Sequence, residues 1–134
     1  MPDTSKWKIR VDEYFKPDER NVPEQYKQNA MELLRKVNIV RNAYGQPMIV
    51  TSGYRNPMYN AEIGGATNSA HTRGMAVDFR DRNGALSNWL LNNLQLLKDI
   101  GLFMENPMYT RGWVHLDMVE RKNVVFLPYS SNLF

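Results

Sequence analysis

Cysteine is absent from this chain of 134 residues, and histidine occurs only twice. The absence of cysteine excludes disulfides, thiolate metal sites and a cysteine nucleophile, so any metal would have to be held by imidazole and carboxylate groups. No apolar run approaches the ~18 residues that a membrane-spanning helix needs. The polar start of the chain, Met1 to Lys6, does not resemble a secretory signal peptide. We therefore expect a chain made in the cytoplasm without a signal peptide and with no membrane partner.

The net charge of the chain is also small. Seventeen Lys and Arg residues against fourteen Asp and Glu residues give a net charge of +3, which is too weak a bias to predict a nucleic-acid partner. The basic pair Arg121 and Lys122 is typical of a solvated surface. A length of 134 residues suits one globular domain. We expect residues 1–134 to form a single, monomeric domain.

Apolar periodicity predicts two helices. In the first, apolar residues recur at helical spacing from Tyr26 to Tyr44, where Pro23 can open the helix and Gly45 can close it. In the second, Ser87 can act as the N-cap and Gly101 ends the helix. The apolar stripe of this second helix consists of Leu90, Leu91, Leu94, Leu97 and Ile100.

Short apolar runs predict a small sheet. The runs that indicate strands cover residues 48–51, 75–79, 102–105 and 113–118, and residues 124–127 could be an edge strand or a packed tail. Residues 52–74 are polar and contain four glycines, which indicates a long functional loop. Local helices combined with hairpin-like strands predict an α+β domain with a small, largely antiparallel sheet and flanking helices.

The two histidines have similar settings. His71 precedes the strand in which Asp78 faces away from the apolar side, and His115 shares a strand face with Asp117. Two imidazoles and one carboxylate, with a fourth position open to water, are a common ligand set of a catalytic zinc ion. Taken singly, a histidine is more often a structural or exposed residue. The hypothesis of a metal site therefore rests on the two settings together.

Four segments of the chain form an ordered pattern. They are Ser52 to Pro57, Asn60 to Ala66, the S-x-H-x-x-G-x-A-x-D stretch from Ser69 to Asp78, and the W-x-H-x-D stretch from Trp113 to Asp117. In this order they resemble the zinc D-Ala-D-Ala peptidases, which include VanX-like dipeptidases, peptidoglycan carboxypeptidases and phage lysis endopeptidases, with the hedgehog signalling domain as a distant structural relative. The resemblance covers about residues 14–119. Its third segment is the most specific, because it fixes five residue types over ten positions.

The resemblance implies roles for five residues. His71, Asp78 and His115 would bind one zinc ion per chain. Arg55 matches an arginine that contacts the substrate carbonyl or carboxylate, a task that suits a planar and permanently charged guanidinium; its alternative is a surface ion pair. Ser69 matches a substrate-binding hydroxyl in some members, although a serine two residues before a loop histidine can equally shape the turn.

The general base is where the sequence departs from the family. Several members place a glutamate three residues before the last zinc histidine, and Gly112 occupies that position here. Glu105, at the end of the preceding strand, could reach a zinc-activated water in a hedgehog-like arrangement. Asp117 is a competing base, since two residues along a strand span only ~6.6 Å on one face, but it could instead support the imidazole of His115. We favour Glu105 over Asp117 as the base. A third alternative is that neither residue acts as the base.

The resemblance predicts a zinc metallopeptidase that hydrolyses peptidoglycan stem or cross-link peptide bonds next to D-amino acids by metal-activated water. Its partner would be bacterial peptidoglycan or its stem peptides. An enzyme made without a signal peptide could reach the cell wall after phage-mediated release. The alternative is a zinc-stabilised binding or virion-structural module without peptidase activity, for which Gly112 is the best support.

Overall fold

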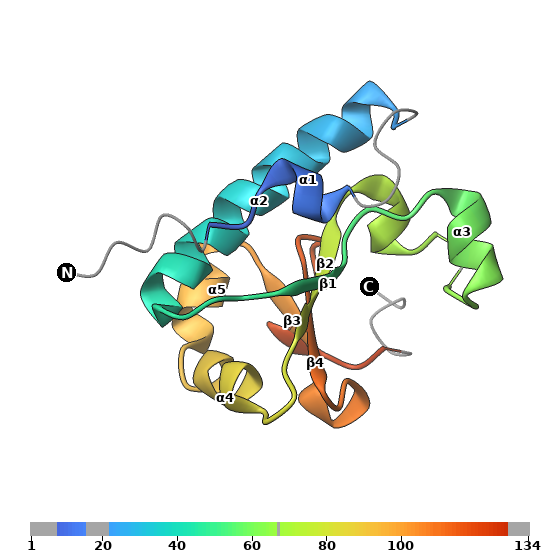
Figure 1. The fold of residues 1–134 in the computed structure, drawn as a ribbon. Coiled ribbons are helices and arrows are strands. Elements are labelled where there is room, and N and C mark those ends of the chain that lie inside the picture. Colours follow the sequence, from blue (N-terminus) through green and yellow to red (C-terminus); the bar gives the residue numbers. More distant parts are fainter. Residues whose placement is uncertain (1–7, 16–21, 67, 129–134) are drawn as a thin grey trace.

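The computed structural model describes residues 8–15, 22–66 and 68–128, and Figure 1 shows their arrangement. In chain order the elements are α1 (Val11–Tyr14), α2 (Glu24–Tyr44), β1 (Val50–Ser52), α3 (Pro57–Glu62), the 3₁₀ helix η2 (Ala70–Arg73), β2 (Ala76–Arg80), α4 (Ala85–Leu91), α5 (Leu94–Ile100), β3 (Phe103–Glu105), the 3₁₀ helix η3 (Pro107–Tyr109), β4 (Trp113–Asp117) and β5 (Val125–Phe126).

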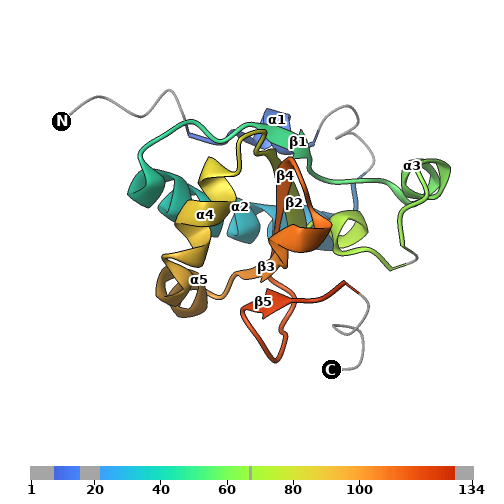
Figure 2. The ribbon, with the colours of Figure 1, turned by 90° about the horizontal axis from the view of Figure 1, so that it is seen from below.

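The strands form one sheet in the order β1-β2-β4-β3-β5. Neighbouring strands are antiparallel except β3 and β5, which are parallel. In Figure 2, α4 and α5 lie on the opposite side of the strands from α3. The α+β class with a small, largely antiparallel sheet is therefore confirmed, and residues 124–127 contribute an edge strand.

One row of residues crosses the sheet from edge to edge. The registers pair Ser52 with Asp78, Asp78 with His115, and Glu105 with Phe126. Strand β3 faces β4 with Met104 opposite Leu116, and one further step along that antiparallel register brings Glu105 opposite His115. Because directly paired residues share a face of the sheet, these five residues form what we call the site row: Ser52, Asp78, His115, Glu105 and Phe126.

The long helix α2 covers the apolar side of the domain. Pro23 precedes it and Gly45 ends it in the left-handed conformation, at φ 73°, which glycine adopts without strain. Its buried stripe joins strand residues such as Val77 and Leu116 in one core. The predicted first helix is confirmed. Among the described residues, no helix is long and apolar enough to cross a membrane.

The prediction of one second helix is wrong, because α4 and α5 are separate helices. At the break, the Asn93 side chain donates to the carbonyl of Trp89 at 2.8 Å, and such side-chain bonds compete with helical backbone bonds.

The prediction that Ser87 is the N-cap of this helix is also wrong. The Asp81 carboxylate accepts from the backbone N–H groups of Leu86 and Ser87, each at 2.9 Å. Leu91, which the sequence places in the apolar stripe, is exposed.

The segment 52–74 is not a structureless loop. Asn56 caps α3, where its side-chain oxygen accepts from the N–H of Tyr59 at 2.8 Å. Further along, η2 ends at Gly74, which has φ 71°. A Cβ at Gly74 would lie 2.4 Å from the carbonyl oxygen of Tyr26 in α2. This glycine therefore lets η2 sit directly against α2.

The short helix α1 lies beside β1, as Figure 2 shows, and contacts the chain that follows this strand. The ring of Tyr14 is fully buried, and its hydroxyl donates to the carbonyl of Ala76 at 2.8 Å. Burial raises the pKa of this hydroxyl far above its usual range. The carbonyl of Tyr14 accepts from the N–H of Tyr54 at 2.9 Å. A Cβ at Gly53 would lie only 2.0 Å from that carbonyl oxygen, so only glycine fits.

We predict that Gly53→Ala destabilises the domain by about 3 kcal/mol, because two backbone segments would have to separate. Gly45→Ala is the matched control: a Cβ there meets nothing within 4 Å, so it carries only the left-handed backbone strain of about 1–2 kcal/mol. Urea unfolding of both variants measures the difference. Equal losses of unfolding free energy would show that Tyr14 and Gly53 are not in close contact.

Candidate metal centre

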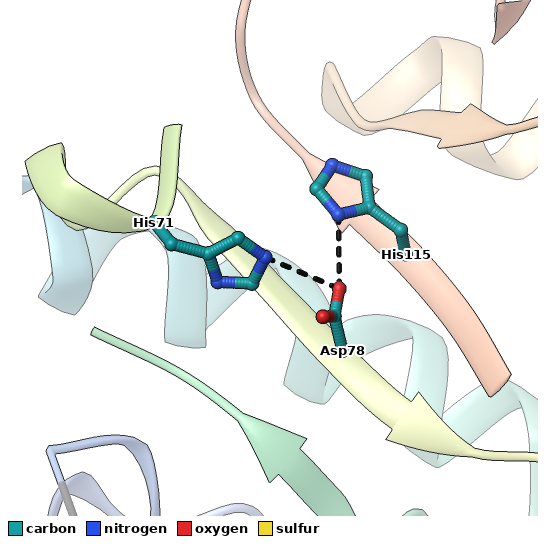
Figure 3. A group of neighbouring side chains, drawn as sticks. All are labelled: His71, Asp78 and His115. Carbon is teal, nitrogen blue, oxygen red and sulfur yellow. Dashed lines mark hydrogen bonds and ion pairs between the residues drawn. The ribbon is translucent and has the colours of Figure 1, made fainter. Parts of the chain in front are cut away.

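The side chains of His71, Asp78 and His115 converge on one point, as Figure 3 shows. The Oδ1 atom of Asp78 lies 3.2 Å from Nε2 of His71 and 2.9 Å from Nδ1 of His115. The three residues are buried, and their possible ligand atoms lie within 4.8 Å of one another. Ligands at about 2.0–2.1 Å around a tetrahedral zinc ion are ~3.3 Å apart, so these two separations are close to those of a zinc site.

His71 is oriented by its backbone surroundings. It lies in η2, whose first turn is capped by Ser69. Its Nδ1 is 2.8 Å from the carbonyl oxygen of Gly53. A carbonyl can only accept, so Nδ1 carries a hydrogen and Nε2 is the nitrogen that faces Asp78. The carbonyl of Gly53, a residue that packs against Tyr14, thus determines which nitrogen of His71 faces Asp78.

His115 and Asp78 are direct cross-strand neighbours. Burial alone would lower the pKa of His115, but its hydrogen bonds to Asp117 and Asp78 outweigh burial and raise the pKa to about 9. Burial alone would raise the pKa of Asp78, yet hydrogen bonds from His115 and His71 hold that pKa well below its usual range. The site is therefore organised around a carboxylate and a positive charge.

This donor set fits a divalent cation. With Nδ1 of His71 donating to Gly53, Nε2 of the neutral ring and the Asp78 oxygen are two acceptors that repel each other unless a proton or a cation lies between them. The Nε2 atom of His115 is 2.8 Å from Oδ2 of Asp117, which leaves Nδ1 to face Asp78. Imidazole nitrogen and carboxylate oxygen are zinc ligands. Residues His71, Asp78 and His115 could therefore hold a zinc ion that replaces the proton.

Asp117 is fully buried and saturated with donors. Besides His115, the N–H of Val119 donates to its Oδ1 at 3.2 Å, and the guanidinium of Arg121 donates to both oxygens, at 3.2 and 2.7 Å. Burial alone would raise the pKa of Asp117, but the bonds from His115 and Arg121 lower it. A carboxylate held in this way is suited to orienting an imidazole and is poorly placed to collect a proton from water.

Glu105 is the more available carboxylate. It lies at the end of β3, next to His115 in the site row, and is half-buried. Within the described ranges its carboxylate makes no hydrogen bond or ion pair. Burial raises the pKa of Glu105, with further increases from the charges of Asp78 and Asp117 and opposing effects from His115 and Arg121. A raised pKa favours proton acceptance and release near neutral pH.

Arg55 lies inside the site and is not a surface ion pair. Its side chain is 16% exposed, and its Nη2 lies 3.5 Å from Oδ2 of Asp78. Its Nε donates to Oγ of Ser52 at 3.0 Å, and its Nη1 donates to Oδ1 of Asn60 at 3.3 Å. Asn60 is itself buried and donates to the carbonyl of Ala66. Of the five N–H groups of a guanidinium, two remain for a substrate.

Ser69 shapes the turn. Its hydroxyl oxygen accepts from the N–H of His71 at 3.2 Å, and its carbonyl accepts from the hydroxyl of Thr72 at 2.6 Å. This is the second of the two roles expected for Ser69. A substrate contact by the same hydroxyl stays a prediction.

Two residues beside the site were not found by sequence reasoning. Arg121 was expected to be solvated surface, but its side chain is only 11% exposed because it binds Asp117. The sequence predicts a tail or an edge strand around Phe126 and does not indicate that its ring packs edge-on against His115, at 5.9 Å between ring centroids and an interplanar angle of 83°. The only sequence feature that could have indicated the role of Arg121 is its position four residues after the acidic Asp117.

Comparison with known proteins agrees with this geometry. A search of curated proteins finds no match to the chain. The family described as peptidase M15, in contrast, matches residues 10–117. That range contains η2, β2 and β4 and ends at Asp117, so it includes the three converging side chains. The peptidases of this family are zinc-dependent. On the extent of this match, the chain belongs to the peptidase M15 family.

Proposed function

We propose that this chain is a zinc metallopeptidase that hydrolyses peptidoglycan stem or cross-link peptide bonds next to D-amino acids. The observation that carries the proposal is the convergence of His71, Asp78 and His115, in a chain of the peptidase M15 family. The choice of peptidoglycan as substrate rests on the sequence resemblance to the D-Ala-D-Ala peptidases. The proposal is supported by Glu105, which lies next to His115 in the site row and could act as the base.

His71, Asp78 and His115 would hold the zinc ion. When bound, zinc would supply Lewis-acid chemistry, polarising the scissile carbonyl and lowering the pKa of a water molecule. Asp117 keeps the ring of His115 oriented by accepting from its Nε2–H group. The carbonyl of Gly53 does the same for His71. These bonds keep one nitrogen of each ring directed at Asp78.

Glu105 would act as general base and then as general acid. It would accept a proton from the attacking water as the new C–O bond forms, and would deliver that proton to the amine as the C–N bond breaks. The remaining N–H groups of Arg55 would donate to the oxyanion that develops on the substrate carbonyl. The bonds from Arg55 to Ser52 and Asn60 hold its guanidinium in place beforehand.

One observation favours a second function, that of a zinc-stabilised binding module without peptidase activity. Gly112 stands where several relatives have the catalytic glutamate, and its φ of 85° is a conformation that L side chains rarely adopt. A glutamate could therefore not simply be restored there. If Glu105 does not act as base, the chain would keep its metal site and lack hydrolysis.

Digestion of cell walls separates the two functions. We predict one zinc ion per chain by elemental analysis and, by mass spectrometry of muropeptides, release of D-Ala or cleaved cross-links. His71→Ala should lose both zinc and hydrolysis, because three protein ligands are needed for the site. A wild-type protein that holds one zinc ion and yields no new muropeptides would overturn the peptidase proposal and support the binding module.

Arg55→Lys should retain zinc but lower kcat by roughly 10²–10³, the usual cost of losing one donor to an oxyanion. A single ammonium cannot bond Ser52, Asn60 and Asp78 while also donating to a substrate. Arg82→Lys, at an exposed position, is the matched control and should leave kcat unchanged. Wild-type turnover in Arg55→Lys would remove Arg55 from the mechanism.

Two carboxamide substitutions separate the candidate bases. Glu105→Gln should lower hydrolysis by roughly 10²–10⁴ at unchanged zinc content, because the amide cannot accept the proton. Asp117→Asn should instead weaken zinc affinity by ~10–100-fold, with hydrolysis partly restored by added zinc. Steady-state kinetics at several zinc concentrations measure both. If the two phenotypes are exchanged, Asp117 is the base.

A further inference from the structure

The residues after β4 return to the metal centre. The match to the peptidase M15 family ends at residue 117, and the following segment, Met118 to Pro128, contains Arg121 and Phe126. We propose that this segment is a clamp that positions the metal ligand His115, in which Phe126 holds Arg121 and Arg121 holds Asp117. The proposal rests on the metal centre of the proposed function, and it assigns positioning roles to two residues outside the matched range.

Arg121 fixes both oxygens of Asp117. Its Nε donates to Oδ1 at 3.2 Å, and its Nη2 donates to Oδ2 at 2.7 Å. Asp117 is fully buried, and the side chain of Arg121 is 11% exposed. A two-point bond from a planar guanidinium sets the plane of the carboxylate as well as its position. Arg121 is also the only cation shown in an ion pair with Asp117 other than His115 within the described ranges.

The plane of Asp117 determines the orientation of His115. Oδ2 of Asp117 accepts from Arg121 and is also the atom 2.8 Å from Nε2 of His115. When Nε2 donates there, Nδ1 is the nitrogen left to face Asp78, 2.9 Å away. A carboxylate free to rotate would give up this bond, and the imidazole could then turn its ring or change tautomer. Outer partners of this kind commonly change metal affinity by 10–100-fold.

Phe126 supports the guanidinium and the imidazole together. The guanidinium carbon of Arg121 lies 3.6 Å from the centroid of the Phe126 ring, in a cation–π arrangement. The edge-on contact with His115 uses the same ring. Phe126 is 7% exposed. Because the Phe126 ring contacts both Arg121 and His115, its loss should make both side chains less firmly held.

Strand β5 holds Phe126 in place through β3. The N–H of Met104 donates to the carbonyl of Val124 at 2.7 Å, and the N–H of Asn106 donates to the carbonyl of Phe126 at 2.8 Å. In the parallel register Phe126 is paired with Glu105. The clamp is therefore attached to the strand that carries the candidate base, and its position is set by backbone bonds.

Zinc affinity, measured by competition with a chromophoric chelator, tests the clamp. We expect Arg121→Gln and Phe126→Leu each to raise the zinc dissociation constant by ~10–100-fold, and Phe126→Tyr, which keeps the ring face, to bind nearly as tightly as wild type. Arg121→Lys should lie between wild type and Arg121→Gln, since it keeps the charge without the two-point bond. Arg82→Gln is the control for loss of an exposed arginine and should bind zinc like wild type.

A double-mutant comparison shows whether Arg121 acts through Asp117. In the Asp117→Asn background, Arg121→Gln should cause little further loss of zinc affinity, whereas two independent structural effects would add. Wild-type affinity in both Arg121→Gln and Phe126→Leu would overturn the clamp, as would full additivity of the double variant. A wild-type protein that binds no zinc would instead overturn the metal centre itself, and with it the proposed function.

Discussion

The Oδ1 atom of Asp78 is the point on which the site depends. It lies within 3.2 Å of an imidazole nitrogen from each histidine, one from η2 and one from β4. A buried carboxylate is costly unless it is paired, so this arrangement requires a positive charge at the centre, supplied by a proton or a metal ion. Sheet register provides half of the geometry, because Asp78 and His115 are cross-strand partners, and the packing of η2 against α2 provides the other half.

Each histidine is held from outside the centre by a different end of the chain. On one side, Tyr14 in α1 contacts Gly53, whose carbonyl accepts from Nδ1 of His71. On the other side, Phe126 and Arg121 act through Asp117 on His115. The short central strands are thus enclosed by segments that are distant in sequence. Segments from both ends of this small domain therefore help to orient the two imidazole rings.

Local patterns predicted the parts of the fold that local forces determine. The apolar spacing of α2 and the alternation around Asp78 and His115 are visible in the sequence because each reflects one helix face or one strand face. The break between α4 and α5 was missed, because the apolar stripe continues across it while the side chain of Asn93 ends the helix. The role of Arg121 was also missed, since the contact between its guanidinium and Phe126 depends on the β3–β5 pairing, which no local pattern encodes.

Anomalous X-ray diffraction from zinc-loaded crystals, recorded on both sides of the zinc absorption edge, shows whether the three side chains bind zinc. One strong peak per chain is expected at ~2.0–2.2 Å from Nε2 of His71, a carboxylate oxygen of Asp78 and Nδ1 of His115. Nε2 of His115 should keep its bond to Asp117. A zinc ion bound through Nε2 of His115, or the absence of any peak between these three side chains, would show that the metal centre described above is wrong.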